Sequence, residues 1–108
     1  MNNQMKCRFE VEDIAPYKDG FGLSGRCTAG PIKVGDVFVF VWKTKIGHGE
    51  DNTVSTQREL IGGVNLVVNE IQYFNKSILE LQTSHSGGLY VLGEGAELLV
   101  PRCEIESA

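Results

Sequence analysis

The fold is decided by one stretch of the sequence, Gly30-Pro-Ile-Lys-Val-Gly-Asp36 followed directly by Val37-Phe-Val-Phe-Val-Trp42. Gly30 and Gly35 can both adopt a positive φ at little cost, and the aliphatic residues between them can tuck beneath a turn. The next six residues are β-branched or aromatic, and a run of this length and composition is typical of a buried strand. The stretch therefore predicts a tight connection that leads into a core strand.

Short strands separated by turn signals are predicted on both sides of this stretch. Residues 6–13 alternate apolar and charged side chains, which is the period-two pattern of a half-buried strand. We expect further strands at residues 21–29, 64–74, 78–81, 89–92 and 98–100. Thirteen glycines and the lack of a sustained 3.6-residue period leave little room for helix. Seven short strands at these spacings predict an all-β barrel or sandwich.

Polar residues take over between the third and fourth predicted strands, in residues 43–63. We expect this polar insertion to be an exposed loop that holds a ragged hairpin near residues 53–60. The chain of 108 residues has the length of one domain and contains no internal repeat or linker. The sequence therefore predicts a single β-barrel domain over residues 1–108.

Six segments follow one another in an order that points to a known family. They are Phe9-Glu-Val-Glu-Asp13, Gly22-Leu-Ser-Gly-Arg26, Gly30-Pro-Ile-Lys-Val-Gly-Asp36, Val68-Asn-Glu-Ile-Gln-Tyr-Phe-Asn-Lys76, Gly88-Leu-Tyr-Val-Leu-Gly93 and Gly95-Ala-Glu-Leu98. Together they resemble the β-barrel second domain of elongation factor Tu and its relatives, over residues 7–100. The resemblance implies a closed, six- to seven-stranded antiparallel barrel of the translation-protein kind. Ser84, where the family usually has glycine, and the longer insertion depart from its pattern.

The resemblance does not extend to the GTPase part of that family. No G-x-x-x-x-G-K-[ST] motif occurs in the sequence, and Asn75-Lys-Ser-Ile78 lacks the aspartate of the N-K-x-D motif that reads guanine. A phosphate cradle of this kind is what nucleotide hydrolysis requires. We therefore expect no bound nucleotide and no cofactor.

The sequence shows no convincing catalytic or metal-binding constellation. His48, Glu50 and Asp51 lie close together in a polar stretch that contains Gly47 and Gly49. A metal site needs three or four ligands held in a fixed geometry, and loop residues beside glycines are poorly held. His85 stands between two serines, and residues adjacent in sequence seldom bring a nucleophile and a base into line. We therefore expect a protein that is not an enzyme.

Charge and cysteine content limit the classes of partner and the cellular compartment that we expect. The net charge is −4, and residues 55–108 hold three cations against seven glutamates. Because phosphate backbones demand clustered positive charge, nucleic acid is a less favoured partner than protein. The three cysteines form no C-x-x-C pair, residues 1–6 lack the apolar region of a signal peptide, and no apolar run reaches the roughly 20 residues of a membrane span. We expect a cytoplasmic protein with free thiols and no membrane contact.

The third predicted strand supplies the candidate contact surface. In the register of the family, Phe38 and Phe40 fill the barrel, and Val37, Val39 and Val41 point outward. Three outward valines would expose a hydrophobic stripe, which soluble monomers normally limit. Either the insertion at 43–63 folds back over this stripe, or a partner protein or a second copy covers it.

Trp42 and His48 border the stripe and complete the predicted protein-contact surface, which comprises Val37, Val39, Val41, Trp42 and His48. The leading hypothesis is a non-enzymatic binding module that engages a protein partner, for example as an immunity or regulatory protein of a bacterial-type system. The alternative is an RNA-, tRNA- or ribosome-associated module, because larger members of the resembled family work in translation.

Overall fold

The computed structural model describes the backbone of residues 6–48 and 54–108 and the side chains of residues 6–44 and 57–108. The elements are β1 (Arg8–Tyr17), β2 (Gly20–Ala29), β3 (Ile32–Lys33), β4 (Val37–His48), β5 (Val54–Tyr73), β6 (Lys76–Ile78), β7 (Glu80–Leu81), β8 (Ser86–Glu94), the 3-10 helix η1 (Ala96–Leu98) and β9 (Glu104–Ser107). No helix in the described ranges is long and apolar enough to cross a membrane.

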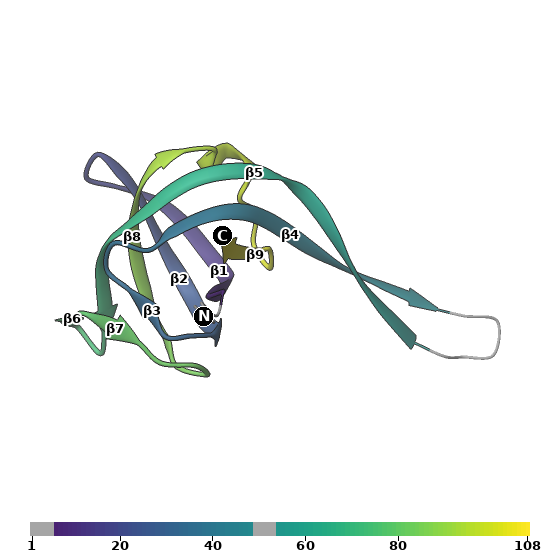
Figure 1. Cartoon of the computed structure of the whole chain (residues 1–108), viewed down its shortest axis with the longest axis horizontal. Helices are drawn as coiled ribbons and strands as arrows, with labels where there is room; N and C mark the ends of the chain where they lie inside the picture. Colours follow the sequence, from purple (N-terminus) through teal and green to yellow (C-terminus); the bar gives the residue numbers. More distant parts are fainter. Residues whose placement is uncertain (1–5, 49–53) are drawn as a thin grey trace, which may run out of the picture.

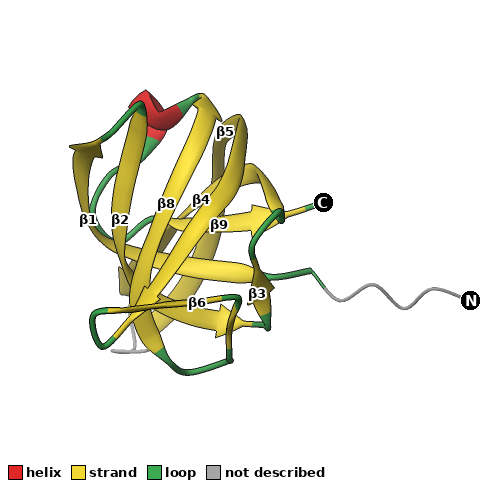
Figure 2. Cartoon of the chain, turned by 90° about the vertical axis from the view of Figure 1, so that its left-hand side faces the viewer, coloured by secondary structure: helices red, strands yellow, loops and turns green. Residues whose placement is uncertain are grey.

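Six strands close into an antiparallel barrel (Figures 1 and 2). Their hydrogen-bonded order is β4-β9-β1-β2-β8-β5, and a second pairing of β5 with β4 completes the ring. β6 adds to β5 as a seventh strand, while β3 and β7 form a separate two-stranded sheet. The prediction of an all-β, closed barrel of six to seven strands is confirmed.

Apolar side chains from all six barrel strands fill the interior. The period-two pattern of residues 6–13 is realised in β1, where Phe9 and Val11 are buried and Glu10 is exposed. The three cysteines are free and buried, and burial raises the pKa of Cys7 to about 11. The largest fully buried side chains are Phe9, Phe38, Leu23, Ile32, Leu66, Ile71, Leu81, Leu89, Ile105, Val11, Val41 and Val68.

The predicted tight connection at residues 30–36 is present and is fastened by Asp36. Its carboxylate accepts a hydrogen bond of 2.8 Å from the Lys33 N–H, and its own N–H donates to the Lys33 carbonyl at 3.0 Å. Gly35 has a φ of +98°, a conformation that favours glycine. Hydrogen bonds from the Gly35 N–H to the Val68 carbonyl (2.8 Å) and from the Val68 N–H to the Asp36 carbonyl (2.9 Å) then fix the connection against β5.

The end of the chain differs from the strand predicted at residues 98–100. Residues 96–98 form η1, and the strand that closes the barrel between β1 and β4 is β9. Pro101 has no N–H to donate, and Arg102 has a φ of +74°, so the chain turns there before β9 begins. Ile105 is fully buried between two outward glutamates, which is the period-two pattern of a half-buried strand.

The insertion at 43–63 also differs from the predicted exposed loop. The β4–β5 ladder runs from Val37 opposite Val67 to His48 opposite Val54. Residues 43–48 and 54–59, which lie beyond the pair of Trp42 with Leu60, project from the barrel as a two-stranded arm (Figure 1). The described part of the insertion therefore does not fold back over the third strand.

The face that β4 presents to the core changes at a β-bulge. The register shifts between Phe38 and Phe40 against both β5 and β9, and such a shift moves the alternation by one residue. Phe38 and Val41 are fully buried, whereas Val39 and Phe40 between them are half-buried. Two predictions were therefore wrong. Val41 points into the barrel rather than outward, and Phe40 does not fill the interior.

Candidate functional site

The residues of the predicted contact surface occupy three different environments. Val37 and Val39 are half-buried on β4, whereas Val41 belongs to the core. Trp42 is half-buried where the arm leaves the barrel. β4 ends at His48, whose side chain lies outside the described residues. The structure thus brings Val37, Val39 and Trp42 to one side of β4 and removes Val41 from it.

Sequence reasoning missed the apolar neighbours of these residues. Val37 lies opposite Val67 on β5, and Val67 lies opposite Leu92 on β8, so three aliphatic residues adjoin across three strands. At the root of the arm, Leu60 is 50% exposed and Ile61 is 39% exposed. The alternation of residues 64–68 could have predicted that Val67 faces outward, because the aliphatic residues on either side of it point inward.

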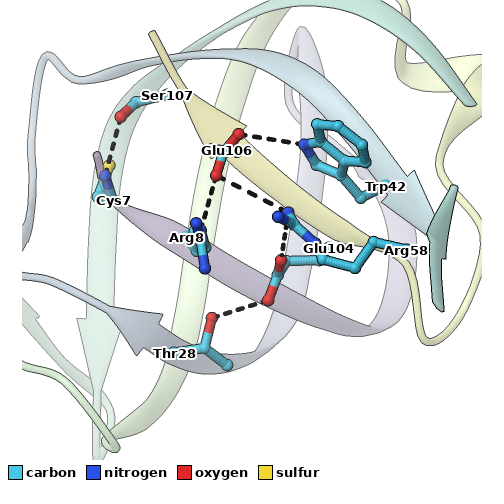
Figure 3. A network of polar contacts seen from close by, with 8 residues as sticks. All are labelled: Cys7, Arg8, Thr28, Trp42, Arg58, Glu104, Glu106 and Ser107. Carbon is cyan, nitrogen blue, oxygen red and sulfur yellow. Dashed lines mark hydrogen bonds and ion pairs between the residues drawn. The ribbon is translucent and has the colours of Figure 1, made fainter. Parts of the chain in front are cut away.

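A polar cluster holds the root of the arm against the outer face of the barrel (Figure 3). Arg58 of the arm donates through Nη2 to Oε1 of Glu104 at 2.8 Å, and the same nitrogen lies 3.7 Å from Oε2 of Glu106. Both glutamates belong to β9. We name the cluster the brace, and its members are Arg8, Thr28, Trp42, Arg58, Glu104 and Glu106.

Glu106 is the centre of the brace. Nε of Arg8 donates to its Oε2 at 2.6 Å, and Nε1 of Trp42 donates to its Oε1 at 3.1 Å. Glu106 is only 3% exposed. Burial opposes its ionisation, but the hydrogen bonds from Arg8 and Trp42, with the charges of Arg8 and Arg58, outweigh this effect and hold its pKa below the ordinary value. One ionised carboxylate therefore joins β1, β4, β9 and the arm.

Further contacts fix the direction in which the arm leaves the barrel. The Arg58 guanidinium lies over the indole ring of Trp42, with 4.3 Å between Cζ and the ring centroid, which is a cation–π contact. Thr28 of β2 donates to Oε2 of Glu104 at 3.1 Å. Because Trp42 is engaged by both Arg58 and Glu106, it fastens the arm and is not a free stacking platform.

A groove of about 340 Å³ lies on the outer face of β1, β2 and β8. These three strands are labelled side by side in Figure 2. The hollow of the groove comes from residues with little or no side chain, since Ala15 lies opposite Gly22 and Ser24 lies opposite Gly88. The lining residues are Asp13, Ile14, Ala15, Tyr17, Gly22, Leu23, Ser24, Gln72, Gly88, Leu89 and Tyr90.

Two tyrosines border this groove. The rings of Tyr17 and Tyr90 meet edge to face with 5.1 Å between their centroids. Nζ of Lys18 lies 5.3 and 5.6 Å from these two centroids and 3.8 Å from Oε1 of Glu70. The groove is thus mainly apolar, with one cation at its tyrosine border.

Of the residues considered for metal binding, Glu50 and Asp51 lie outside the described residues, as does the side chain of His48. No group of three or more His, Cys, Asp or Glu side chains in the part of the chain that the structure describes could hold a metal ion. His85 stacks on the ring of Tyr73 with 5.3 Å between centroids.

No family model matches the sequence, and no curated protein matches it. The structure is similar to that of translation elongation factor SelB from Methanococcus maripaludis in its apo form, with a TM-score of 0.65 over 98% of this chain. The fold is that of a translation-factor barrel. The predicted resemblance to the second domain of elongation factor Tu is thereby confirmed for the fold.

This chain shares 20% sequence identity with SelB and covers 20% of the SelB chain. The chain therefore spans about a fifth of the length of that factor. At this identity the likeness concerns the fold alone, and what the barrel does must be argued from its own surfaces.

Proposed function

We propose that this protein is a non-enzymatic binding module that engages a protein partner through the arm and its root. The observation that carries the proposal is the braced arm. A two-stranded hairpin alone is marginally stable in water, but here Arg58 and Trp42 tie it to two glutamates of β9. An element that is already fixed in direction loses less conformational freedom on binding.

The arm also offers strand edges to a partner. β4 pairs with β9 as far as Trp42, and β5 pairs with β8 only from Asn65 onward. Within the described residues, the two strands of the arm therefore pair with each other alone. Unpaired edges are templates for an added strand. We propose that an extended segment of the partner adds to the β5 edge, where the exposed Leu60 and Ile61 supply apolar contacts.

The likeness to SelB favours a partner among the proteins that meet translation factors, because SelB is a translation elongation factor. A toxin neutralised by this module is the other class of partner that the hypothesis of an immunity protein entails. Both classes require the same surface on this chain, so one variant tests both.

The test uses a shortened arm in which Asn-Gly replaces residues 45–57. Thr44 and Arg58 are cross-strand partners, so a two-residue hairpin loop can join them and the brace is kept. The wild-type protein is immobilised on a resin and incubated with native cytosol at physiological salt. It should retain a partner that the shortened variant does not retain. The surface variant Arg26→Ala should behave as wild type.

Equal urea midpoints for the two proteins would show that the shortened variant is folded. Retention of the same partner by both would exclude the arm as the binding element. Recovery of no protein by the wild type would argue against a protein-binding module altogether.

A second function, binding of an RNA end, is favoured by the groove. Tyr17, which is 39% exposed, offers an aromatic surface of the kind on which bases stack, and Lys18 lies beside its ring. This candidate predicts tRNA binding at about 50 mM salt that weakens as salt rises, and that Tyr17→Ala weakens further. Fluorescence anisotropy measures it, and an unchanged signal at low salt excludes it. We place it second because Asp13 also lines the groove and phosphates favour clustered cations.

A further inference from the structure

Phe74 belongs to the turn between β5 and β6. The β6 end of the molecule lies opposite the arm (Figure 1). The side chain of Phe74 is 81% exposed, the largest exposure of any large apolar residue in the described ranges. The ring touches one aromatic neighbour, Tyr73, edge to face with 4.5 Å between the ring centroids. A phenylalanine so exposed leaves nearly all of its apolar surface in water.

The backbone at this turn is also unfavourable for phenylalanine. Phe74 and Asn75 have φ values of 51° and 63°, and they link the paired residues Tyr73 and Lys76 as a two-residue hairpin loop. Asn and Gly are favoured where both central residues need a positive φ, whereas a bulky residue there is an outlier. Neither burial nor turn geometry therefore accounts for an aromatic ring at this position.

The groove described above lies close to Phe74 on the same sheet. Gln72, two residues before Phe74 on β5, lines it, and its cross-strand partner Gly88 forms part of the hollow. β2, β8 and β6 are seen from one side of the barrel in Figure 2. A cavity of about 150 Å³ already holds a benzene molecule. The groove, at about 340 Å³ and largely apolar, is large enough for a phenyl ring.

We propose that two copies of this chain associate about a two-fold axis, with Phe74 of each copy inserted into the groove of the other. A two-fold interface uses the same patch twice and must be self-complementary. A protruding ring beside a hollow that accepts it satisfies this condition, and both contacts form at once. The dimer would cover the groove and leave the arm of each copy free, so the proposal does not depend on the proposed function of the arm.

The expected interface is small. Each inserted aromatic ring buries roughly 150–250 Å². With the groove walls that they cover, two rings account for roughly 600–1,000 Å², which is below the roughly 1,200–2,000 Å² of stable complexes. The dimer should therefore be weak and form in proportion to protein concentration.

The experiment is sedimentation equilibrium from micromolar to millimolar concentration. The wild-type mass should rise from 11.9 kDa toward twice that value. Phe74→Ala should weaken association by at least about tenfold, as truncation of a central aromatic residue does at other interfaces. Leu79→Ala is the matched control, because Leu79 is 80% exposed but follows β6 at its far end. A monomeric wild type, an equal loss with Leu79→Ala, or a mass beyond two chains would overturn the proposal.

A second variant tests the groove itself. Gly88→Leu should fill it without disturbing the backbone, because a Cβ there would meet the Leu23 carbonyl oxygen at 3.7 Å and the Gln72 Cβ at 3.9 Å, ordinary contacts. The variant should be monomeric. Labelled Phe74→Ala protein keeps its groove, and unlabelled Gly88→Leu protein keeps its phenylalanine. The unlabelled protein should therefore shift the resonances of the Ala15 methyl group and the Gly22 amide of the labelled one, because both residues line the groove. Unlabelled Phe74→Ala protein should not shift them, and the reverse pattern would contradict the insertion of Phe74.

Discussion

At the scale of single residues, Glu106 has the most demanding environment on the barrel surface. Its carboxylate accepts hydrogen bonds from Arg8 and Trp42 and lies near Arg58. The Glu106 side chain is nevertheless almost fully buried. Glu106→Gln removes the charge that these partners require. We expect a loss of about 1–3 kcal/mol in the free energy of unfolding at pH 7, because Arg8 and Arg58 are themselves partly exposed. Urea denaturation of both proteins measures it.

The same residue predicts a pH dependence. The pKa of Glu106 is lowered in the folded protein, so its contribution is complete above the ordinary glutamate pKa and is lost as the pH falls through the folded value. The stability gap between wild type and Glu106→Gln should therefore be widest near neutral pH and should narrow below about pH 4. Glu70→Gln, at a carboxylate bonded by Gln72 and Ser77, should cost less at pH 7. A gap that does not change with pH would contradict this role of Glu106.

At the scale of elements, the arm and the barrel differ in what holds their hydrogen bonds. Barrel strands pair on two sides over a buried core, whereas residues 43–48 and 54–59 pair on one side. Amide hydrogens of the arm should therefore exchange much faster than those of residues 64–72. Arg58→Ala should accelerate exchange in the arm alone, because it removes the tie to Glu104 and Glu106. Hydrogen exchange read by NMR checks this, with Arg26→Ala as the control. Uniform acceleration over the barrel would contradict a local role for Arg58.

At the scale of the whole molecule, closure of the barrel depends on the four-residue β9. Ile105 is fully buried there between β1 and β4. Ile105→Ala should lower the free energy of unfolding by about 2–5 kcal/mol, whereas Val67→Ala, on the outer face of β5, should change it by less than about 1 kcal/mol. Urea transitions followed by Trp42 fluorescence and by circular dichroism should coincide in each protein. Equal losses in both variants would show that β9 is not critical to closure.

The sequence was most informative where the signal is local. The Gly30–Asp36 connection depends on the positive φ of Gly35, and the sequence pattern placed a glycine there. The alternation of Phe9 and Val11 with charged residues likewise placed β1 correctly. Patterns of this kind need no knowledge of which strands lie side by side.

What the sequence did not predict depends on register between distant segments. The bulge at Phe38–Phe40 reverses the facing of Val41, and it is defined only against β5 and β9. Arg58 meets Glu104 across 46 positions of sequence, and their two strands, β5 and β9, come together only as the two neighbours of β4. The groove likewise arises from glycines on β2 and β8 that become neighbours only in the folded sheet.

One strand of 20 residues, β5, belongs to the arm, to the barrel wall and to the β6 hairpin. A load applied to the arm would therefore run along the axis of β5, across a ladder whose hydrogen bonds stand perpendicular to the strand. Such bonds are loaded in shear and share the force, whereas a pull on the terminal β9 would peel its few pairs in turn. We expect single-molecule unfolding to need more force when the protein is pulled through the arm than when it is pulled through Ser107. A partner bound to the arm would then exert force on this protein without unfolding the barrel.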